Sequence, residues 1–406
     1  MSSASSGAEP QTPAGGQAPL DPPKAVSPAT PAHDLAARYQ RGDFLFTTAE
    51  RALLAQGTIR TVTETDPRRL ASAIPGVLAE TGAPLAVGVL PFDTGPDTKV
   101  PGHLVVPRTV HRSEGAPSLP REVLPAPVRV RAVPSPAQHM AAVSAAVEAL
   151  ASRDLRKAVL ARALDLEFAA PVSAESVVRN LAVGNPRHFT YAAELPGGRS
   201  LVGATPELLL RRTGRTVFSS PHAGSMPRSA DPATDRANGE ALRTSRKDQL
   251  EHAVVIDYLV EALRPFCRTL EVPAEPELVT TPAIWHLRTP ITGELADPDV
   301  TALDLAAALH PTPAVCGTPT DGARELVQEL EPFDRDYYAG AVGWVDASGD
   351  GEWAVAIRCA EIASTSMRLY AGGGIVPASD PQAELDETTA KFRTLLSAMG
   401  LEDLPV

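Results

Sequence analysis

Apolar positions recur with two different spacings along the chain, and each spacing predicts a different kind of element. In residues 136–153 and 244–266 apolar side chains return every three or four positions, which predicts two helices with one buried face. In residues 157–168 large and small apolar side chains alternate, which predicts a buried strand. A further helix is predicted at 174–183. The chain therefore mixes helices and strands, as α/β or α+β proteins do.

The other segments predict mainly strands joined by turns. Strands are predicted at 85–92, in the meander 191–220, at 283–295, in the hairpin 340–362 and at 367–376. Less regular structure is predicted elsewhere: a strand, a turn and a short helical piece at 43–57, a surface connection at 107–135, a glycine-containing loop at 223–228 that suits an anion, and a polar segment at 231–243.

The strand at 157–168 begins with a lysine. Lys157 shares a strand face with Val159, Ala161 and Ala163, and these side chains are small and apolar. One interpretation is a lysine at the strand entrance with its tip in water. The other is a partly desolvated lysine whose lowered pKa lets it act as a base. The local pattern leaves both open.

Two more charged side chains lie in apolar surroundings. Glu207 follows Pro206 between two apolar strand runs, so its carboxylate points either into water or into a cleft, where burial would raise its pKa and suit a general acid. Arg358 shares a predicted strand face with Ala354 and Ala356, which leaves room for a carboxylate above its guanidinium.

The helix at 244–266 carries a carboxylate on its buried face. Its apolar residues come in pairs, and Leu250 and Glu251 continue the same stripe toward the N-terminus. A carboxylate in such a position needs a partner. A metal ion, a cationic ligand or an internal salt bridge would each serve.

Residues 371–391 combine a glycine-rich turn with a polar helix. Three consecutive glycines, 372–374, allow backbone N–H groups to approach a ligand closely. In the following helix Glu384, Glu387 and Lys391 fall on one face. This arrangement suits a divalent cation beside an anionic ligand, although a solvated helix face has the same pattern.

Composition excludes several classes of function. The chain has 406 residues and a net charge of −12, which argues against non-specific binding to nucleic acid or to an anionic membrane. Its three cysteines are far apart and have no metal-binding spacing, so we expect reduced thiols in a cytoplasmic protein. Neither a membrane span nor a secretory signal is expected. Residues 1–32 predict a disordered tail.

The chain resembles the chorismate-utilising enzymes, and most closely the isochorismate synthases of siderophore pathways. The resemblance covers residues 36–402, and its motifs are LRKAVLAR, GATPELLLRR, SRKDQLEH, IWHLRTP, HPTPAVCGTPT, EPFDRDYYAGAVGW, GEWAVAIRCA and AGGGIVPASDPQAELDETTAK. It implies an α/β fold of two large, mostly antiparallel sheets packed face to face with helices outside. We expect residues 33–406 to form one catalytic domain, with a scaffold part at 33–135 and a motif-bearing part at 136–402.

The resemblance also implies a binding role for each charged residue. Mg²⁺ would neutralise the ring carboxylate of chorismate and would be held by Glu251 and Glu387, with Glu384 close by. Further substrate contacts are implied for these residues: Arg358, Tyr338 and the Gly372, Gly373 and Gly374 backbone at the side-chain carboxylate, Lys391 near the bound anion, Gly224 and Ser225 at the ring end, and His286 and Ala314 along the pocket wall.

By the same resemblance, Lys157 would activate a water that attacks C2, and Glu207 would protonate the departing C4 hydroxyl. The product is isochorismate, formed without a redox cofactor. A salicylate synthase, which next eliminates pyruvate, is the alternative, and the loop HPTPAVCG favours the enzyme that stops at isochorismate. A chorismate-binding protein without turnover is the alternative of another class. We expect a monomer.

Overall fold

The computed structural model describes residues 32–95, 98–115, 119–281 and 284–404, and the segment predicted to be a disordered tail lies outside this part except for its last residue. The helices are α1 (Ala32–Arg38), α2 (Pro67–Thr81), α3 (Pro136–Ser152), α4 (Ala174–Gly184), α5 (Pro232–Thr244), α6 (Arg246–Leu263), α7 (Ala302–Leu309), α8 (Thr320–Leu330) and α9 (Pro381–Met399).

The strands include most of the segments predicted from alternation. They are β1 (Phe44–Thr47), β2 (Arg51–Glu64), β3 (Leu85–Leu90), β4 (Gly102–Glu114), β5 (Arg129–Val133), β6 (Lys157–Glu167), β7 (Phe189–Leu195), β8 (Arg199–Thr205), β9 (Leu208–Thr213), β10 (Thr216–Ser220), β11 (His222–Pro227), β12 (Cys267–Glu271), β13 (Glu277–Thr280), β14 (Ile284–Arg288), β15 (Ile291–Leu295), β16 (Gly317–Thr318), β17 (Ala341–Asp346), β18 (Gly351–Val355), β19 (Cys359–Ala363) and β20 (Ser366–Ile375).

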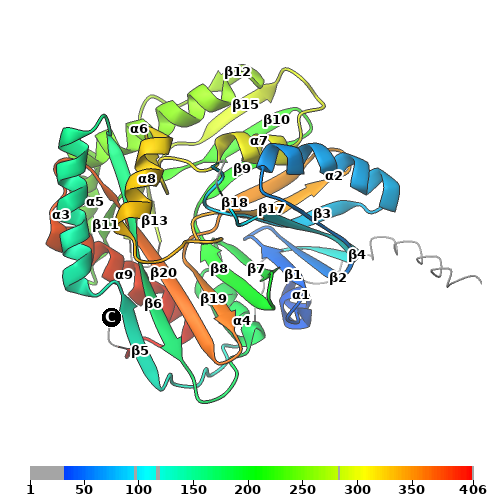
Figure 1. Cartoon of the computed structure of the whole chain (residues 1–406), viewed down its shortest axis with the longest axis horizontal. Helices are drawn as coiled ribbons and strands as arrows, with labels where there is room; N and C mark the ends of the chain where they lie inside the picture. Colours follow the sequence, from blue (N-terminus) through cyan, green and yellow to red (C-terminus); the bar gives the residue numbers. More distant parts are fainter. Residues whose placement is uncertain (1–31, 96–97, 116–118, 282–283, 405–406) are drawn as a thin grey trace, which may run out of the picture.

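One curled antiparallel sheet contains 17 of these strands (Figure 1). Neighbours follow the order β12-β15-β10-β9-β18-β17-β3-β4-β2-β1-β7-β8-β19-β20-β6, and both β5 and β16 pair with the remaining edge of β6. The predicted fold class is confirmed. The two expected sheets are the two halves of this one sheet, joined where β1 pairs with β2.

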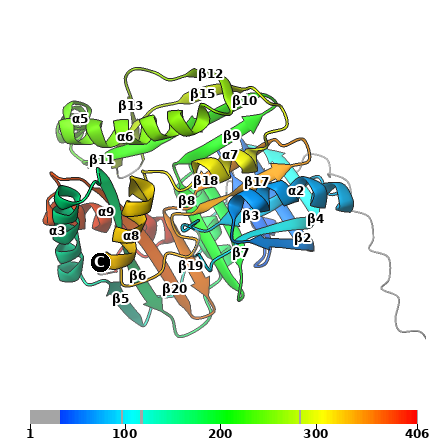
Figure 2. The same ribbon diagram turned by 45° about the horizontal axis from the view of Figure 1, so that its top comes forward.

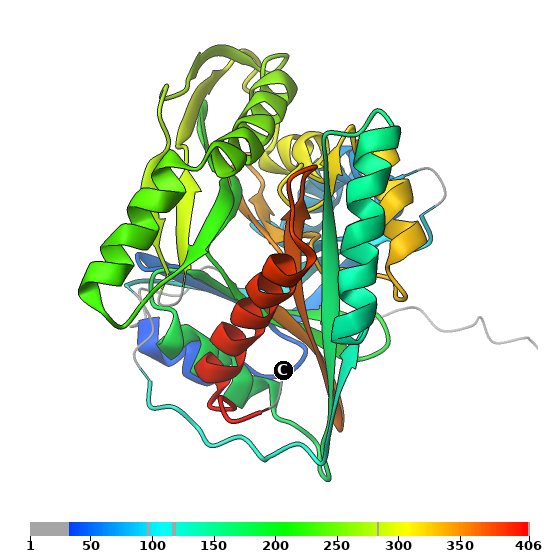
Figure 3. The ribbon, with the colours of Figure 1, turned by 90° about the vertical axis from the view of Figure 1, so that its left-hand side faces the viewer.

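The two halves enclose the larger apolar core. This core contains side chains of both halves, such as Val89 of β3 and Ala193 of β7. A second core lies on the other face of β6, where Leu164 and Leu166 pack with Leu396 of α9 and Val178 of α4. Figure 3 shows α9, in red, running along the outside of the sheet next to α3. The large apolar side chains that alternate along β6 thus hold α9 against the sheet.

A separate three-stranded sheet, β11-β14-β13, carries α5 and α6 above the large sheet (Figure 2). Two predictions in this region are wrong. Residues 223–227 of the expected glycine-containing loop belong to β11, and the expected single strand 283–295, whose first residue lies outside the described residues, is two strands in different sheets. The polar segment 231–243 lies almost entirely in helix α5. Pro290 lies between β14 and β15, where its missing N–H donor interrupts strand pairing.

Other local predictions also fail where long-range pairing decides the structure. The helical piece expected within 43–57 is the beginning of β2, which pairs with β4 along its length. The surface connection expected at 107–135 contains the end of β4 and the whole of β5. Gly372, Gly373 and Gly374 form no turn, because they lie inside β20 opposite β6. Arg358 lies between β18 and β19 instead of on a strand, with φ of +51°.

Candidate active site

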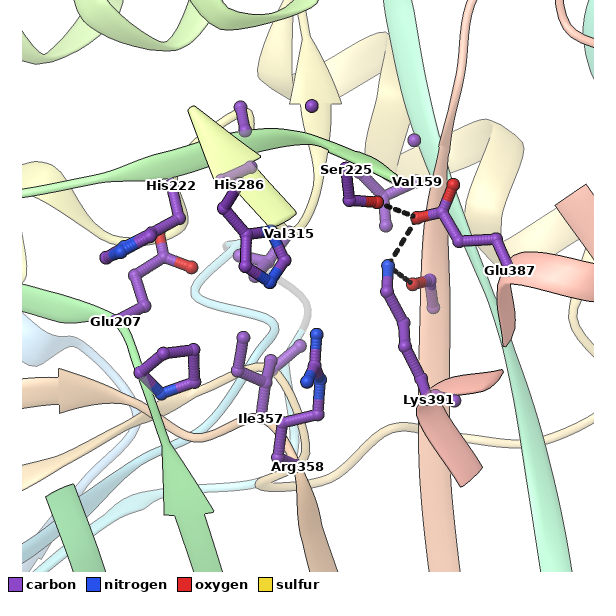
Figure 4. A pocket seen from close by; sticks show the side chains of 18 of the residues that line it. Val159, Glu207, His222, Ser225, His286, Val315, Ile357, Arg358, Glu387 and Lys391 are labelled. Atoms are coloured by element: carbon purple, nitrogen blue, oxygen red, sulfur yellow. Dashed lines mark hydrogen bonds and ion pairs between the residues drawn. The ribbon is translucent and has the colours of Figure 1, made fainter. Parts of the chain in front are cut away.

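A pocket opens where the first residues of β6 and the last residues of β20 meet α6, α9 and β11 (Figure 4). It brings together nearly all of the site residues expected from the sequence. The exceptions are Gly373 and Glu384, which do not line it. The residues that line it are Lys157, Glu207, Gly224, Ser225, Glu251, His286, Ala314, Tyr338, Arg358, Gly372, Gly374, Glu387 and Lys391.

Lys157 lies at the start of β6 and is 1% exposed. Its strand is fixed on both edges, by β20 on one side and by the short β16 on the other. The Lys157 Nζ is 2.9 Å from Glu251 Oε1 of α6. The interpretation that places the lysine tip in water is therefore wrong. The partner that the inward Glu251 carboxylate needs is an internal salt bridge.

Glu207 lies between β8 and β9 and is 4% exposed. Its backbone N–H donates to Thr205 Oγ1 at 3.2 Å, which fixes the bend that turns the carboxyl group into the pocket. Burial raises the pKa of Glu207 to about 7, although the positive charge of Lys157 acts in the opposite direction. The group is thus protonated in much of the neutral range, as a general acid requires.

The first two turns of α9 present Glu384 and Glu387 toward α6. Glu387 Oε1 accepts hydrogen bonds from Ser225 Oγ at 2.9 Å and from Lys391 Nζ at 2.6 Å. Burial, the largest single influence, would raise the pKa of Glu387, but Lys391, Ser225 and Lys247 together outweigh it, lower the pKa and keep the carboxylate ionised. Glu384 is 2% exposed, so the interpretation of a solvated helix face is wrong.

Glu384 lies behind the pocket wall. Its two carboxylate oxygens differ in their hydrogen bonding. Oε1 accepts from Ser379 Oγ at 2.7 Å and from Lys247 Nζ at 3.2 Å. Oε2 is buried and has no hydrogen-bond partner among the described residues. Burial, and then the charge of Glu387, raise the pKa of Glu384. A buried carboxylate oxygen without a partner is costly, so a cation bound at Oε2 would lower that cost.

The three glycines of β20 let side chains approach the strand closely. A Cβ at position 374 would contact Glu251 Oε1 and would lie 2.9 Å from Lys157 Cε. A Cβ at position 372 would lie 2.9 Å from the Tyr338 hydroxyl. None of the three has a positive φ. Glycine is needed here for space, and not for an unusual backbone conformation.

Arg358 supplies an uncompensated positive charge to the pocket. It is buried, and its Nη1 has no hydrogen-bond partner among the described residues. Burial lowers the pKa of this guanidinium. Close by, Tyr338 stacks on Tyr370 with ring centroids 4.6 Å apart. A buried guanidinium that faces a cavity suits a carboxylate of a ligand.

The opposite wall comes from the small sheet. Gly224 has φ of +77° at a bulge in β11, which turns Ser225 toward Glu387. His286 of β14 is buried, and burial lowers its pKa so that the ring is neutral. Its Nε2 has no hydrogen-bond partner within the described part of the chain.

Comparison with known proteins accounts for this constellation. Residues 111–400 match the family described as chorismate binding enzyme. The isochorismate synthase DhbC of Bacillus subtilis is 45% identical, with 92% of this chain and 98% of that protein covered. The chain belongs to the chorismate-binding enzyme family. The resemblance inferred from the motifs is confirmed.

Two more known proteins are similar to this chain over most of its length. The vibriobactin-specific isochorismate synthase of Vibrio cholerae is 38% identical, with 91% of this chain and 94% of that protein covered. A solved structure from Bacillus anthracis, assigned as the 2,3-dihydroxybenzoate-specific isochorismate synthase DhbC, aligns with a TM-score of 0.86 and 41% identity. That alignment covers 91% of this chain and 99% of the other.

Several residues that line the pocket were not predicted from the sequence as site residues. They are Val159, Pro206, His222, Ala223, Val315, Ala339, Ile357, Tyr370 and Ala371. Val159 could have been found, because it shares the strand face of Lys157. His222 could not, because it lies between the predicted meander 191–220 and the predicted loop 223–228, where no pattern singled it out. His222 meets His286 edge to face, with ring centroids 5.8 Å apart.

The donor set at the α6–α9 end fits a hard cation. Glu251, Glu384 and Glu387 offer carboxylate oxygens, which Mg²⁺ prefers, and Glu384 Oε2 has no other partner. Each carboxylate also holds a lysine in this structure. Across residues 32–95, 98–115, 119–281 and 284–404, no three metal-binding side chains already surround a common point.

The loop that precedes β16 is bonded directly to the strand of Lys157. Thr318 pairs with Lys157, and the Val159 N–H donates to the Cys316 carbonyl at 2.9 Å. Arg335 donates to the Val315 carbonyl at 2.8 Å and to the Val159 carbonyl at 2.6 Å. The pocket wall around Ala314 and Val315 thus moves together with β6.

Proposed function

We propose that this enzyme converts chorismate to isochorismate. The observation that carries the proposal is a buried lysine and a buried, protonatable carboxyl in one pocket, Lys157 and Glu207. Beside them lies the guanidinium of Arg358, whose Nη1 has no hydrogen-bond partner in the described part of the chain. The reaction adds the hydroxyl of a water at C2, shifts both ring double bonds and releases the C4 hydroxyl, protonated by the acid, as water. It needs a base, an acid and cationic groups for two carboxylates.

Lys157 acts as the base in this proposal. It accepts a proton from the attacking water, which requires the neutral amine at that moment. In this structure the Lys157 Nζ lies 2.9 Å from Glu251 Oε1, so this contact has to be released when Lys157 takes the proton of the water. Glu207 donates its proton to the departing C4 hydroxyl, and burial keeps that proton available near neutral pH.

The charged ends of the substrate are held by different residues. Arg358 and Tyr338, together with the backbone of residues 372–374, bind the carboxylate of the enolpyruvyl side chain. Gly224, Ser225, His286 and Ala314 surround the ring, and Lys391 adds charge near the bound anion. We propose Mg²⁺ as the cofactor: held by Glu251 and Glu387 with Glu384 close by, it neutralises the ring carboxylate when bound.

The destination of the product is proposed from the relatives. One is specific for vibriobactin, and another is assigned as specific for 2,3-dihydroxybenzoate, so we propose siderophore biosynthesis for this chain. We also propose one catalytic domain at 33–406 that works as a monomer in the cytoplasm. Its three cysteines are free, as a reducing compartment requires, and no helix among the described residues is long and apolar enough to cross a membrane.

One incubation tests the activity. Purified protein, chorismate and Mg²⁺ are mixed, the products are separated by chromatography, and pyruvate is measured in parallel. We expect a mixture of chorismate and isochorismate without pyruvate, and no conversion when EDTA is present. Salicylate with an equal amount of pyruvate would establish the salicylate synthase instead. Bound but unconsumed chorismate at saturating Mg²⁺ would establish a binding protein without turnover.

A further inference from the structure

The three carboxylates at the α6–α9 end are each paired with a different lysine. The pairs are Lys157 Nζ to Glu251 Oε1 at 2.9 Å, Lys391 Nζ to Glu387 Oε1 at 2.6 Å, and Lys247 Nζ to Glu384 Oε1 at 3.2 Å. Figure 4 shows the pair of Lys391 and Glu387 at the pocket wall. Three ammonium groups thus balance three carboxylates when no metal is present.

The three lysines differ in how firmly they are held. Lys157 is buried at the start of β6, and Lys391 donates a second hydrogen bond to the Gly372 carbonyl at 2.7 Å. The Lys247 side chain is 33% exposed, and Glu384 is its one hydrogen-bond partner among the described residues. Lys247 also does not line the pocket. It is therefore the lysine that can leave its carboxylate at the lowest cost.

The position of Lys247 in its helix points the same way. It lies in the first turn of α6, directly after the N-cap Ser245 and Arg246. A positive charge in the first turn opposes the helix dipole, so helix stability does not account for a lysine there. The carboxylate of Glu384 does, because its Oε1 lies 3.2 Å from the Lys247 Nζ.

Glu384 cannot hold an ammonium group and a divalent cation equally well. Its Oε2 is free to accept a cation while Lys247 occupies Oε1. Two cations on one buried carboxylate repel each other, because little water screens them. Binding of one therefore weakens the hold on the other.

We propose that Lys247 and the metal ion compete for Glu384, so that Lys247 sets the metal affinity of the enzyme. Lys247 neutralises Glu384 in the metal-free protein and turns toward solvent when Mg²⁺ binds. This inference depends on the Mg²⁺ site of the proposed function. It adds a role for a residue outside the pocket that touches neither the substrate nor the reacting atoms.

The test is a calorimetric titration of the metal-free full-length protein with Mg²⁺, without chorismate. Lys247→Met removes the ammonium group but keeps a stem of similar length. We expect this variant to bind Mg²⁺ about tenfold tighter than the original protein, and Lys247→Arg to bind with nearly the original affinity. Lys247→Gln provides a second neutral variant in case the methionine variant does not fold, as judged by circular dichroism.

Arg246→Met is the matched control. Arg246 is exposed in the same turn of α6, so its loss changes the net charge equally without removing a partner of Glu384. We expect its Mg²⁺ affinity to stay within twofold of the original. Two results would overturn the competition. One is an equal Mg²⁺ affinity of Lys247→Met and Arg246→Met. The other is weaker Mg²⁺ binding by Lys247→Met or Lys247→Gln than by the original protein. Absence of Mg²⁺ binding in every protein, the original included, would overturn the metal site itself.

Discussion

Glutamate side chains at the two ends of the pocket have pKa values shifted in opposite directions. At one end, burial raises the pKa of Glu207 to about 7. At the other end, Lys391 and Ser225 contact Glu387 directly, and its pKa is lowered although it is buried as well. Burial alone therefore does not decide the protonation state in this pocket. For Glu387, the contacts with Lys391 and Ser225 and the charge of Lys247 outweigh burial. For Glu384, which Lys247 contacts, burial and the charge of Glu387 dominate.

This difference separates two tasks. The Glu207 end keeps a proton that can be given away, whereas Glu387 at the α6–α9 end stays ionised and can hold a cation. Lys157 lies between them, paired to Glu251 of the charged end while its charge also lowers the pKa of Glu207. Removal of the Lys157 side chain should therefore affect both the Glu251 carboxylate and the pKa of Glu207.

Removal of either proton-transfer group should abolish most of the activity while leaving substrate binding nearly intact. For Lys157→Ala and for Glu207→Gln we expect kcat to fall on the order of 10²–10⁴-fold, because general base or acid catalysis contributes about that much. The equilibrium dissociation constant of chorismate should change only about threefold for Glu207→Gln, because the amide has the size and hydrogen-bonding capacity of the protonated carboxyl group. Glu194→Gln, an exposed change on β7, is the control. Turnover close to that of the original enzyme would remove the substituted residue from the mechanism.

A methyl group at position 374 should disturb the charged end specifically. The new Cβ of Gly374→Ala would contact Glu251 Oε1 and press on Lys157 Cε, so the ion pair must shift. We expect kcat/KM to fall on the order of 10²-fold, the effect of a misplacement of about 1 Å. Gly76→Ala in α2 is the control, since its Cβ would meet nothing within 4 Å. Equal activities of the two variants would show that the ion pair needs no such space.

The pH dependence should report the Glu207 end. An acid with a pKa of about 7 is protonated below that pH and loses its proton above it. Activity measured as kcat/KM in the free enzyme should therefore fall above pH 7, by about tenfold per pH unit once deprotonation is complete. The residual activity of Glu207→Gln should lack this decline, because an amide does not titrate. A decline that persists in that variant would assign it to another group.

The sequence could predict the parts of the site that lie within single elements. The strand of Lys157, the buried stripe with Glu251 and the shared face of Glu384 and Glu387 each follow from spacing within one short segment. The patterns left open whether Lys157 and Glu384 face water or the interior, and the structure buries both, together with Glu251. The proton-transfer and metal-binding roles assigned to them remain predictions until the variants are measured.

The sequence could not predict which of these parts would meet. The ion pair of Lys157 and Glu251 joins β6 to α6, and the pair of Lys247 and Glu384 joins α6 to α9. No local pattern contains such long-range contacts. For the same reason β2 was partly predicted as a helix: its pairing with β4, and not its own composition, decides its conformation.

The bonding of β16 to β6 has a consequence for how such enzymes can diverge. Thr318 pairs with Lys157, and Arg335 joins the carbonyls of Val315 and Val159. A substitution in the loop around Ala314 is therefore transmitted to the strand that carries the proposed base. Changes at these two places should be epistatic, with effects that depend on each other instead of adding. An evolutionary path toward a new product would then have to alter the wall and the catalytic strand in a permitted order.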